Sequence, residues 1–370
     1  MDTFTVSLRR VVDDSYPIRI GARLEDALLA DLQNGLLGGV KRLAVLTDDT
    51  VAPLYGEALT EKLAAAGYDA RLFAFPAGEL SKTREKKAEL EDRLLAAGYR
   101  RDCAIVNVGG GVVSDLGGFL AGTFARGVPF VNYATTLLAA ADASVGGKTA
   151  VDTPLATNLI GLFNQPKAVY IDTACWATLP RRQIASGLAE TIKHACLGHP
   201  GFFAWLEDHL EDILALEPEA CRHMAQENCA VKYEVVMQDE REAGLREILN
   251  LGHTVGRALE TVSGYELLHG EAVAVGLVAE TRLALRLGTL TEGDAARVKA
   301  LLERAELPVA LPAGVDREAL VQKLYTDKKV RNGKLRFVVQ QGLGAMREFS
   351  PGVWSTTVDE ETAREIIGEL

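Results

Sequence analysis

The chain lacks a hydrophobic run long enough to cross a membrane. Its longest uncharged stretch worth testing, residues 127–141, is shorter than the roughly 20 residues of a spanning helix and contains Pro129 and Asn132. The first 21 residues also lack the apolar core of a secretory signal peptide. We therefore expect a cytoplasmic protein that has no membrane contact.

Positive charge and paired cysteines are also scarce. The 40 Lys and Arg residues are outnumbered by 51 Asp and Glu residues, which gives a net charge of −11. This balance argues against general binding of nucleic acids or anionic membranes, but it still permits a local basic pocket for an anionic small molecule. The cysteines are odd in number and show no CxxC spacing, so we expect buried free thiols in a reducing compartment. They are Cys103, Cys175, Cys196, Cys221 and Cys229.

The length and composition are those of an ordinary globular protein of about two domains. The chain has 370 residues, of which 48% are hydrophobic and 25% charged. Apolar strand patterns alternate with helix patterns in the first half, which predicts an α/β domain with a parallel sheet covered by helices on both faces. Residues 4–21 fit two strands, TVSL and YPIRI, and residues 103–108 a buried strand.

Helix patterns dominate after residue 176, so we place the domain boundary near 172–180. The chain then divides into an α/β domain, 1–176, and a mainly α-helical domain, 177–370. Residues 334–340 fit a late strand. The predicted helices are 181–197, 201–215, 218–238, 242–262, 269–287, 292–305 and 316–325.

A stripe of polar residues follows one of these predicted helices. Spacings of 4, 4, 3 and 4 would place the stripe on one helix face, while the remaining residues are mostly apolar. Buried charge needs partners, so the stripe indicates a polar cavity inside the protein. Its members are Glu242, Arg246, Asn250, His253 and Arg257.

A glycine triplet, Gly109–Gly111, separates the strand at 103–108 from a helix pattern in VNVGGGVVSDLGG. Such a turn lets backbone N–H groups face a phosphate, although a plain tight turn has the same sequence. Asp48 and Glu79 are candidates for binding ribose hydroxyls. Each could equally be a helix cap or a turn residue.

Two further segments carry isolated charges among small or apolar residues. Lys148 lies in GGKT, between Asp142 and Asn158, where it suits an oxyanion or phosphate ligand; a surface loop lysine is the alternative. Glu190 and Lys193 share a helix face, which is also the pattern of a routine surface ion pair. Their apolar neighbours favour a covered helix.

Two histidines and a carboxylate form a possible metal site. His253 and His269 belong to consecutive predicted helices, and Glu190 would complete a set of two histidines and one carboxylate. Such a set leaves coordination positions open and suits catalytic Zn²⁺. On spacing alone, scattered histidines with a purely structural role are the alternative.

These motifs together resemble the sugar phosphate cyclases, and within them the 3-dehydroquinate synthases. The resemblance runs from about Asp48 to Phe337. It implies a Rossmann-like NAD-binding domain followed by a helical domain, an active site in the cleft between them, and a homodimer. The segments that carry it are PAGELSKT, GGGVVSDLGGF, RGVPF, TTLLAAADASVGGKT, NLIGLFNQP, GLAETIKHA, DEREAGLREILNLGHTVG, LHGEAVAVG and DKKVRNGKLRF.

The resemblance also implies roles for individual residues. A metal ion, Zn²⁺ or Co²⁺, would be bound by Glu190, His253 and His269. The groups that contact NAD would be Asp48, Glu79, Lys82, Gly110, Gly111, Val112, Val113, Ser114, Asp115, Thr135 and Thr136. The substrate phosphate and carboxylate would meet Arg126, Asp142, Lys148, Asn158, Lys193, Lys232, Arg246, Asn250 and either Lys328 or Lys329. Catalytic roles would fall to Lys148, Lys193, Glu242 and Arg257.

The implied reaction converts 3-deoxy-D-arabino-heptulosonate 7-phosphate to 3-dehydroquinate and phosphate. NAD⁺ would first oxidise the metal-bound C5 alcohol, and the new ketone would acidify the C6 proton so that phosphate leaves by elimination. NADH would then return the hydride, and ring opening with an internal aldol closure would give the product. The cofactor is regenerated in each turnover.

The chain departs from the family pattern at three positions. Arg257 stands where the synthases usually have a second histidine, in GHTxGH, and arginine is a poor general base. Thr157 stands where lysine is common, and Ser114 where glycine is common. Arg257 therefore either contacts an anion or indicates a different substrate.

Three alternatives follow from these departures and from the two-domain pattern. The chain could be a sister cyclase acting on a related sugar phosphate, such as sedoheptulose 7-phosphate. It could be a metal-dependent alcohol dehydrogenase, which would produce NADH in net amounts. It could also be a binding protein that has lost catalysis through the change at Arg257.

Overall fold

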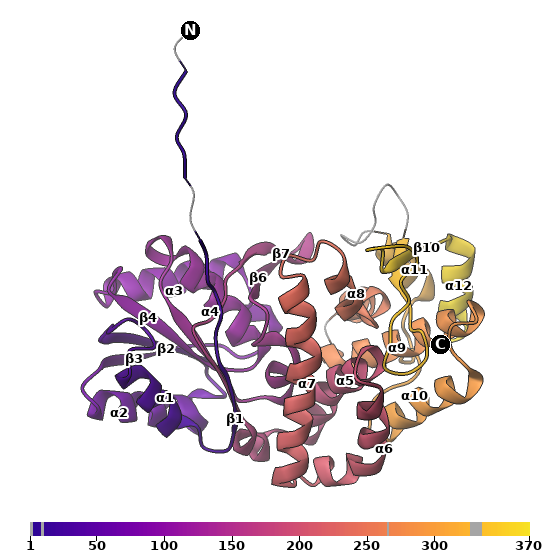
Figure 1. Cartoon of the computed structure of the whole chain (residues 1–370), viewed down its shortest axis with the longest axis horizontal. Coiled ribbons are helices and arrows are strands. Elements are labelled where there is room, and N and C mark those ends of the chain that lie inside the picture. Colours follow the sequence, from indigo (N-terminus) through magenta and orange to yellow (C-terminus); the bar gives the residue numbers. More distant parts are fainter. Residues whose placement is uncertain (1–2, 9–10, 265, 326–334) are drawn as a thin grey trace.

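The computed structural model describes residues 3–8, 11–264, 266–325 and 335–370. It consists of a parallel α/β sheet region followed by a helical region, which lie side by side in Figure 1. This is the predicted fold class.

The sheet has six parallel strands in the order β1-β8-β5-β4-β2-β3. Alternating residues of β2 face opposite sides: Leu43 and Val45 pack on the side of α1 and α2, and Ala44 and Leu46 on the side of α3 and α4. Both faces are therefore covered, as expected for an all-parallel sheet. The elements are β1 (Ile18–Gly21), β2 (Arg42–Asp48), β3 (Asp69–Phe75), β4 (Cys103–Gly109), β5 (Phe130–Ala134), β8 (Val169–Asp172), α1 (Glu25–Gln33), α2 (Glu57–Ala65), α3 (Arg84–Ala96) and α4 (Gly111–Thr123).

A separate antiparallel hairpin lies against α4. It is formed by β6 (Lys148–Thr153) and β7 (Ala156–Phe163). The predictions assigned no secondary structure to this segment. The hairpin carries two predicted site residues, Lys148 and Asn158, to the border between the sheet and the helical region.

The helical region is built around α5, in which every residue from Ile184 to Leu197 is buried. Its core continues into the sheet region, because Val169 and Ile171 of β8 belong to the same hydrophobic cluster. The proposed division at 176/177 therefore stays a prediction. The elements are α5 (Arg181–Leu197), α6 (Pro200–Leu214), α7 (Pro218–Gln238), α8 (His253–Val262), α9 (His269–Arg286), α10 (Glu292–Arg304), α11 (Arg317–Leu324), β9 (Leu335–Val338), β10 (Ser355–Val358) and α12 (Glu360–Gly368).

The predicted helix over 242–262 is wrong in its first half. The carboxylate of Asp239 accepts hydrogen bonds from the backbone N–H groups of Ala243, Gly244 and Arg246 at 2.8–3.0 Å. These bonds replace the helical ladder, as local side-chain acceptors often do. A short 3-10 helix, η6 (Leu245–Asn250), follows, and α8 begins only at His253.

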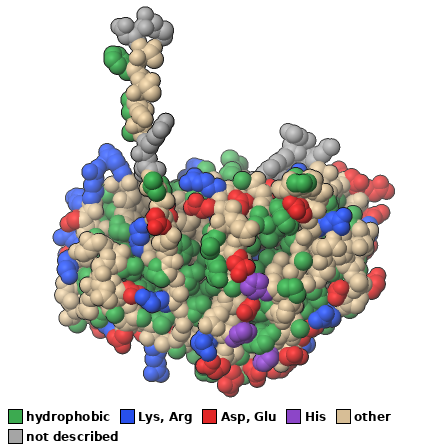
Figure 2. Space-filling view, viewed as in Figure 1, with side chains coloured by type: hydrophobic (Ala, Val, Ile, Leu, Met, Phe, Trp, Pro, Cys, Tyr) green, Lys and Arg blue, Asp and Glu red, His purple; other side chains and the backbone are tan. Residues whose placement is uncertain are grey.

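The predicted strand TVSL is also wrong. Residues 3–8 are extended but have no neighbouring strand, and they stand away from the body of the molecule (Figures 1 and 2). Phe4 and Leu8 are 92% and 89% exposed. An alternating pattern makes a strand only where a hydrogen-bonding partner is available.

All five cysteines are free and buried, as their number and spacing predicted. The reducing compartment remains a prediction. Among the described residues, no helix combines the length and apolar character needed to span a bilayer.

Candidate active site

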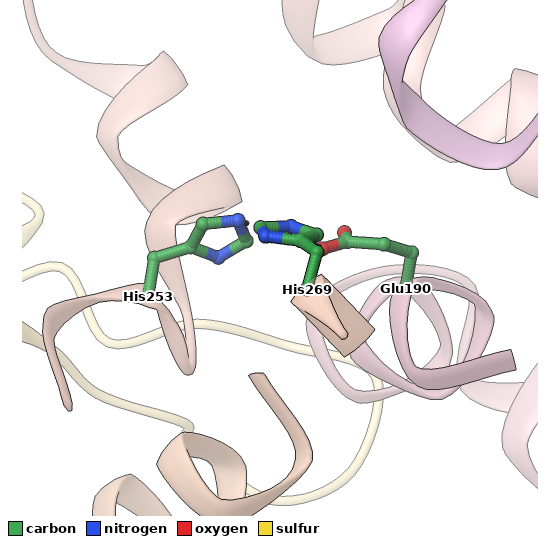
Figure 3. A group of neighbouring side chains, drawn as sticks. All are labelled: Glu190, His253 and His269. Atoms are coloured by element: carbon green, nitrogen blue, oxygen red, sulfur yellow. Dashed lines mark hydrogen bonds and ion pairs between the residues drawn. The ribbon is translucent and has the colours of Figure 1, made fainter. Parts of the chain in front are cut away.

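Three side chains from three different helices of the helical region lie close together (Figure 3). Glu190 lies in the middle of α5, while His253 and His269 are the first residues of α8 and α9. One ligand atom from each lies within 4.8 Å of the others. Nε2 of His253 and Nε2 of His269 are 3.4 and 3.2 Å from Oε1 of Glu190. The structure thus brings the predicted metal ligands together.

Glycine allows these helices to approach so closely. A methyl group at Gly276 of α9 would lie 1.8 Å from the carbonyl oxygen of Gly252, directly before α8. A methyl group at Gly270 would lie 1.8 Å from the carbonyl oxygen of Ser186 on α5. Both contacts are with backbone, which cannot move aside as a flexible side chain would. The positions of both histidines are therefore set by backbone packing.

The other ring nitrogen of each histidine has its own acceptor. Nδ1 of His253 lies 3.1 Å from the carbonyl oxygen of Leu251, and Nδ1 of His269 lies 3.0 Å from Glu260. A carbonyl only accepts, so Nδ1 of His253 carries the proton and its Nε2 is left as a lone-pair donor. Partners of this kind orient the histidine ligands of protein metal sites.

The charges of the cluster indicate that it attracts a cation. Burial lowers the pKa of His253 well below its usual value. Burial would also lower the pKa of His269, but Glu260 and Glu190 raise it to about 10. Burial alone would raise the pKa of Glu190, yet Lys193 and His253 hold it well below its usual value. A carboxylate and two imidazoles in this arrangement fit Zn²⁺ with open coordination positions.

A second group of possible ligands, Asp142, Glu190 and His194, is less suitable. Asp142 is already paired with Lys232 at 2.8 Å, and Nζ of Lys193 lies 3.9 Å from its carboxylate and forms an ion pair with Glu190. A metal ion here would lie next to two ammonium groups, which would repel it.

A cavity of about 470 Å³ opens beside the cluster. Its described lining includes seven basic side chains against four acidic ones, although the chain as a whole is acidic. Anionic ligands are favoured in such a pocket. The charged residues are Lys148, Lys193, Lys232, Arg241, Arg246, Arg257, Arg336, Asp115, Asp142, Glu242 and Glu247.

Buried ion pairs connect this cavity to the ligand cluster. Lys193, 1% exposed, lies between Glu190 and Asp142. Lys232 donates hydrogen bonds to the carboxylate and the backbone oxygen of Asp142. Burial would raise the pKa of Asp142, but these two lysines lower it well below its usual value. Each buried charge thus has a partner, as its burial requires.

The polar stripe does line one cavity, although it does not lie on one helix face. Arg246, 1% exposed, donates through Nη2 to the carbonyl oxygen of Gly146 at 2.8 Å. Glu242 accepts hydrogen bonds from Lys148 at 2.6 Å and from Asn250 at 2.8 Å. Irregular backbone around η6, rather than helical spacing, therefore brings these groups together.

Arg257 lies one helical turn after His253 and also lines the cavity. Its Nη1 is buried and has no hydrogen-bond partner in the described parts of the chain. A buried guanidinium N–H without a partner is costly, so this side chain is ready to bind an anion.

The predicted NAD contacts gather at the carboxyl ends of three neighbouring strands. Asp48 ends β2, Gly110–Asp115 follow β4 as the N-cap and first residues of α4, and Thr135 and Thr136 follow β5. Ligands of open α/β sheets bind at such edges, and the N-terminus of α4 faces this edge with free N–H groups. The buried Oγ1 of Thr135 has no partner within the described chain.

Other members of this set already have protein partners. The carboxylate of Asp48 accepts hydrogen bonds from the backbone N–H groups of Thr50 and Val51. This is the turn-capping role that was the alternative for Asp48. Lys82 is 4% exposed, and its ammonium lies 2.6 Å from Asp115 and 3.4 Å from Glu79.

Some predicted residues lie elsewhere. Arg126 is not part of the cavity; it borders a separate open hollow with Arg100 and Arg101. Lys328 and Lys329 lie outside the described residues. The predictions missed Arg336, which lines the cavity and donates to Ser355 at 2.9 Å. Arg336 belongs to the motif DKKVRNGKLRF, and this could have marked it as a candidate site residue.

The fold and the arrangement of the candidate site are those of the sugar phosphate cyclases. Residues 72–186 match the family model described as 3-dehydroquinate synthase N-terminal, and residues 187–330 match the one described as 3-dehydroquinate synthase C-terminal. The chain belongs to the 3-dehydroquinate synthase family.

Curated relatives agree with this assignment. The chain is 44% identical over 336 residues to the 3-dehydroquinate synthase of Desulforamulus reducens, which covers 90% of this chain and 93% of the relative. It is 45% identical over 335 residues to that of Acidithiobacillus ferrooxidans, covering 90% of each.

Solved structures show the same architecture. 2-epi-5-epi-valiolone synthase from Streptomyces hygroscopicus subsp. jinggangensis, with NAD⁺ and Zn²⁺ bound, has a TM-score of 0.87 and 28% identity and covers 99% of both chains. 2-deoxy-scyllo-inosose synthase, with carbaglucose-6-phosphate, NAD⁺ and Co²⁺, has a TM-score of 0.86 and 25% identity, covering 95% of this chain and 96% of the other. A probable glycerol dehydrogenase from Sinorhizobium meliloti, with 19% identity, a TM-score of 0.61 and coverage of 96% and 95%, shares the fold alone.

Replacing Glu190 or His253 by alanine should abolish activity and zinc content together, because each change removes one of three ligands. Zinc is measured by mass spectrometry on purified protein. His209→Ala, which removes a histidine outside the cluster, is the matched control and should keep its zinc. Full zinc stoichiometry in Glu190→Ala would reject this ligand set.

Proposed function

We propose that this chain is a 3-dehydroquinate synthase that converts 3-deoxy-D-arabino-heptulosonate 7-phosphate to 3-dehydroquinate and phosphate. The observation that carries the proposal is a set of zinc-type donors beside a basic cavity. The substrate has both a phosphate and a carboxylate, so it needs several cations, and the cavity supplies them inside an acidic chain. Identity of 44–45% to two relatives of this name supports the choice of substrate.

The residues present fit both groups that the reaction needs. When bound, NAD⁺ supplies a reversible hydride acceptor and Zn²⁺ supplies a Lewis acid for the substrate alcohol. Glu190, His253 and His269 would hold the metal. The N-terminal end of α4 at Gly110–Asp115, with its backbone N–H groups, and Thr135–Thr136 after β5 would hold the dinucleotide.

The basic side chains of the cavity bind and orient the substrate. Lys148, Arg246 and Lys232 come from β6, η6 and α7, so they reach the cavity from different sides. Cations distributed in this way can hold a phosphate and a carboxylate at opposite ends of one molecule. Fixing both ends places the alcohol carbon against the metal cluster and limits the conformations that the substrate can adopt.

We assign the unpaired Nη1 of Arg257 to an anionic group of the substrate. Arginine keeps its charge at neutral pH and does not act as a proton carrier there. The proton transfer expected of the family histidine would then fall to another group in the site.

A sister cyclase acting on a related sugar phosphate is the second candidate. The similarity to 2-epi-5-epi-valiolone synthase over 99% of both chains favours it, together with Arg257. The homodimer and the cytoplasmic location remain predictions.

A phosphate-release assay tests the function. Purified protein with NAD⁺ and Zn²⁺ should release phosphate from heptulosonate phosphate without net production of NADH. If the protein does not turn over this sugar phosphate, the proposed function is wrong. Turnover of sedoheptulose 7-phosphate instead would identify the sister cyclase, and accumulation of NADH would indicate a dehydrogenase.

The dependence of kcat/KM on pH should reflect the protonation state of Lys148. Burial, opposed by the nearby Glu242, lowers its pKa to about 8. The charged form therefore predominates below pH 8 and is lost above it, so kcat/KM for the anionic substrate should fall as the pH rises through about 8.

Lys148→Arg keeps its charge to much higher pH and should lose this alkaline limb. Lys62→Arg, on the surface of α2, is the control and should keep it. An unchanged limb in Lys148→Arg would assign the titration to another group.

Two substitutions separate the possible roles of Arg257. Arg257→His should keep kcat/KM within about threefold, because imidazole can also bind an anion. Arg257→Ala should lose about tenfold or more, since a charged hydrogen bond is removed. A collapse of activity in Arg257→His would show that the guanidinium itself has a specific partner.

A further inference from the structure

Asn158 has a backbone conformation that needs support. Its φ is +56°, in the left-handed region that asparagine tolerates but does not prefer. Its side chain lines the cavity, and its buried Oδ1 has no hydrogen-bond partner among the described residues. The conformation thus places an unpaired carboxamide where the substrate is expected.

The side chain of Asp152 provides this support. Its Oδ1 accepts a hydrogen bond from the backbone N–H of Asn158 at 2.7 Å. Hydrogen bonds to a carboxylate are stronger than those to a neutral oxygen. The bond joins β6 to β7 close to the turn between them, and it holds the backbone of Asn158 from within the hairpin.

Asp152 also contacts a segment outside the hairpin. The pairing register shifts beside it: Val151 pairs with Ile160 and Thr153 with Ala156, so the extra residues of a bulge lie in β7, within 157–159, opposite Asp152. The backbone N–H of Asp152 donates to the carbonyl oxygen of Lys82 at 2.7 Å. Asp152 therefore contacts both Asn158 of β7 and the backbone of the buried Lys82.

The surroundings of Asp152 are buried and charged. The ammonium of Lys82 is held by Asp115 and Glu79, and these three groups also act on Asp152. Burial raises the pKa of Asp152 to about 6, against the attraction of Lys82. A carboxylate is expensive in such a place, which argues that it has a role beyond filling a surface turn.

We propose that Asp152 is a positioning residue for the substrate: its carboxylate fixes the left-handed conformation of Asn158 and so aims that carboxamide into the cavity. This inference rests on the proposed function, because the effect appears in substrate binding. It assigns a role to a residue that does not line the cavity.

A double-mutant cycle tests it. Asp152→Ala should raise KM for heptulosonate phosphate about tenfold, with kcat and KM for NAD⁺ changed less than about threefold. Asp152→Asn, which keeps an acceptor oxygen of the same reach, should stay within about threefold of wild type. Asn158→Gly removes the carboxamide without backbone strain, and in that background Asp152→Ala should change KM less than about twofold.

Two outcomes would overturn the proposal. One is an unchanged KM in Asp152→Ala; the other is a KM effect of the same size in the Asn158→Gly background, because the two residues would then act independently. If Asp152→Ala fails to fold, Asp152→Glu takes its place in the cycle, since it keeps the charge but displaces the acceptor and should also raise KM.

Controls separate this role from stability and from the function itself. Asp359→Ala loses an equivalent bond, from the N–H of Thr362 at 2.8 Å, far along the chain, and should leave KM unchanged. If the wild-type protein does not turn over heptulosonate phosphate, the proposed function fails. The dissociation constant for inorganic phosphate, measured by calorimetry, then replaces KM in the same cycle.

Discussion

The site depends on one buried charge. Glu190 is fully buried in the middle of α5, and its carboxylate is surrounded by Lys193, His253 and His269. An isolated carboxylate at this depth would be very costly, so the fold must bring compensating groups to it. Helices α8 and α9 both begin next to Glu190, and the cavity opens beside their first residues. The arrangement of the helical region is therefore closely tied to the compensation of this charge.

A second layer of charge extends from Glu190 towards the sheet. Lys193 joins it to Asp142, which is in turn held by Lys232. These contacts cross from helices α5 and α7 to a short π-helix, η4 (Ala139–Ala143), that follows β5. The same ion pairs that satisfy buried charge therefore also connect the two regions. A net charge of −11 for the chain is compatible with an anionic substrate because basic groups outnumber acidic ones in the lining of this cavity.

Much of the fold was predictable because strong periodicity and buried core positions coincide. The helix at 181–197 agrees with α5 residue for residue, and the ligand set of Glu190 and the two histidines meets as expected. The segment 242–250 was not predictable from spacing, because the carboxylate of Asp239 captures backbone N–H groups that a periodic pattern would place in a helix. The polar residues still reach one cavity, so the prediction of a cavity was right while its structural reason was wrong.

The hairpin contacts were beyond sequence reasoning for a related reason. Asp152 contacts Asn158 because β7 carries the extra residues of a bulge opposite it, and no spacing rule reports a bulge. For Arg126 the sequence signal was present but misleading. The family motif surrounds it, yet in the single chain it borders a hollow separate from the cavity beside the metal-ligand candidates. The strand expected at TVSL failed because alternation says nothing about whether a neighbouring strand exists.

The glycine contacts between α5, α8 and α9 have a thermodynamic consequence. Since Gly270 and Gly276 pack against backbone of the neighbouring segments, the three predicted metal ligands are positioned by contacts between helices as well as by their own interactions. In small zinc domains, by contrast, metal binding and folding are one event, because little else holds the ligands together. Side chains that are already placed by backbone packing lose less conformational entropy when they bind a ligand than side chains on a mobile segment would.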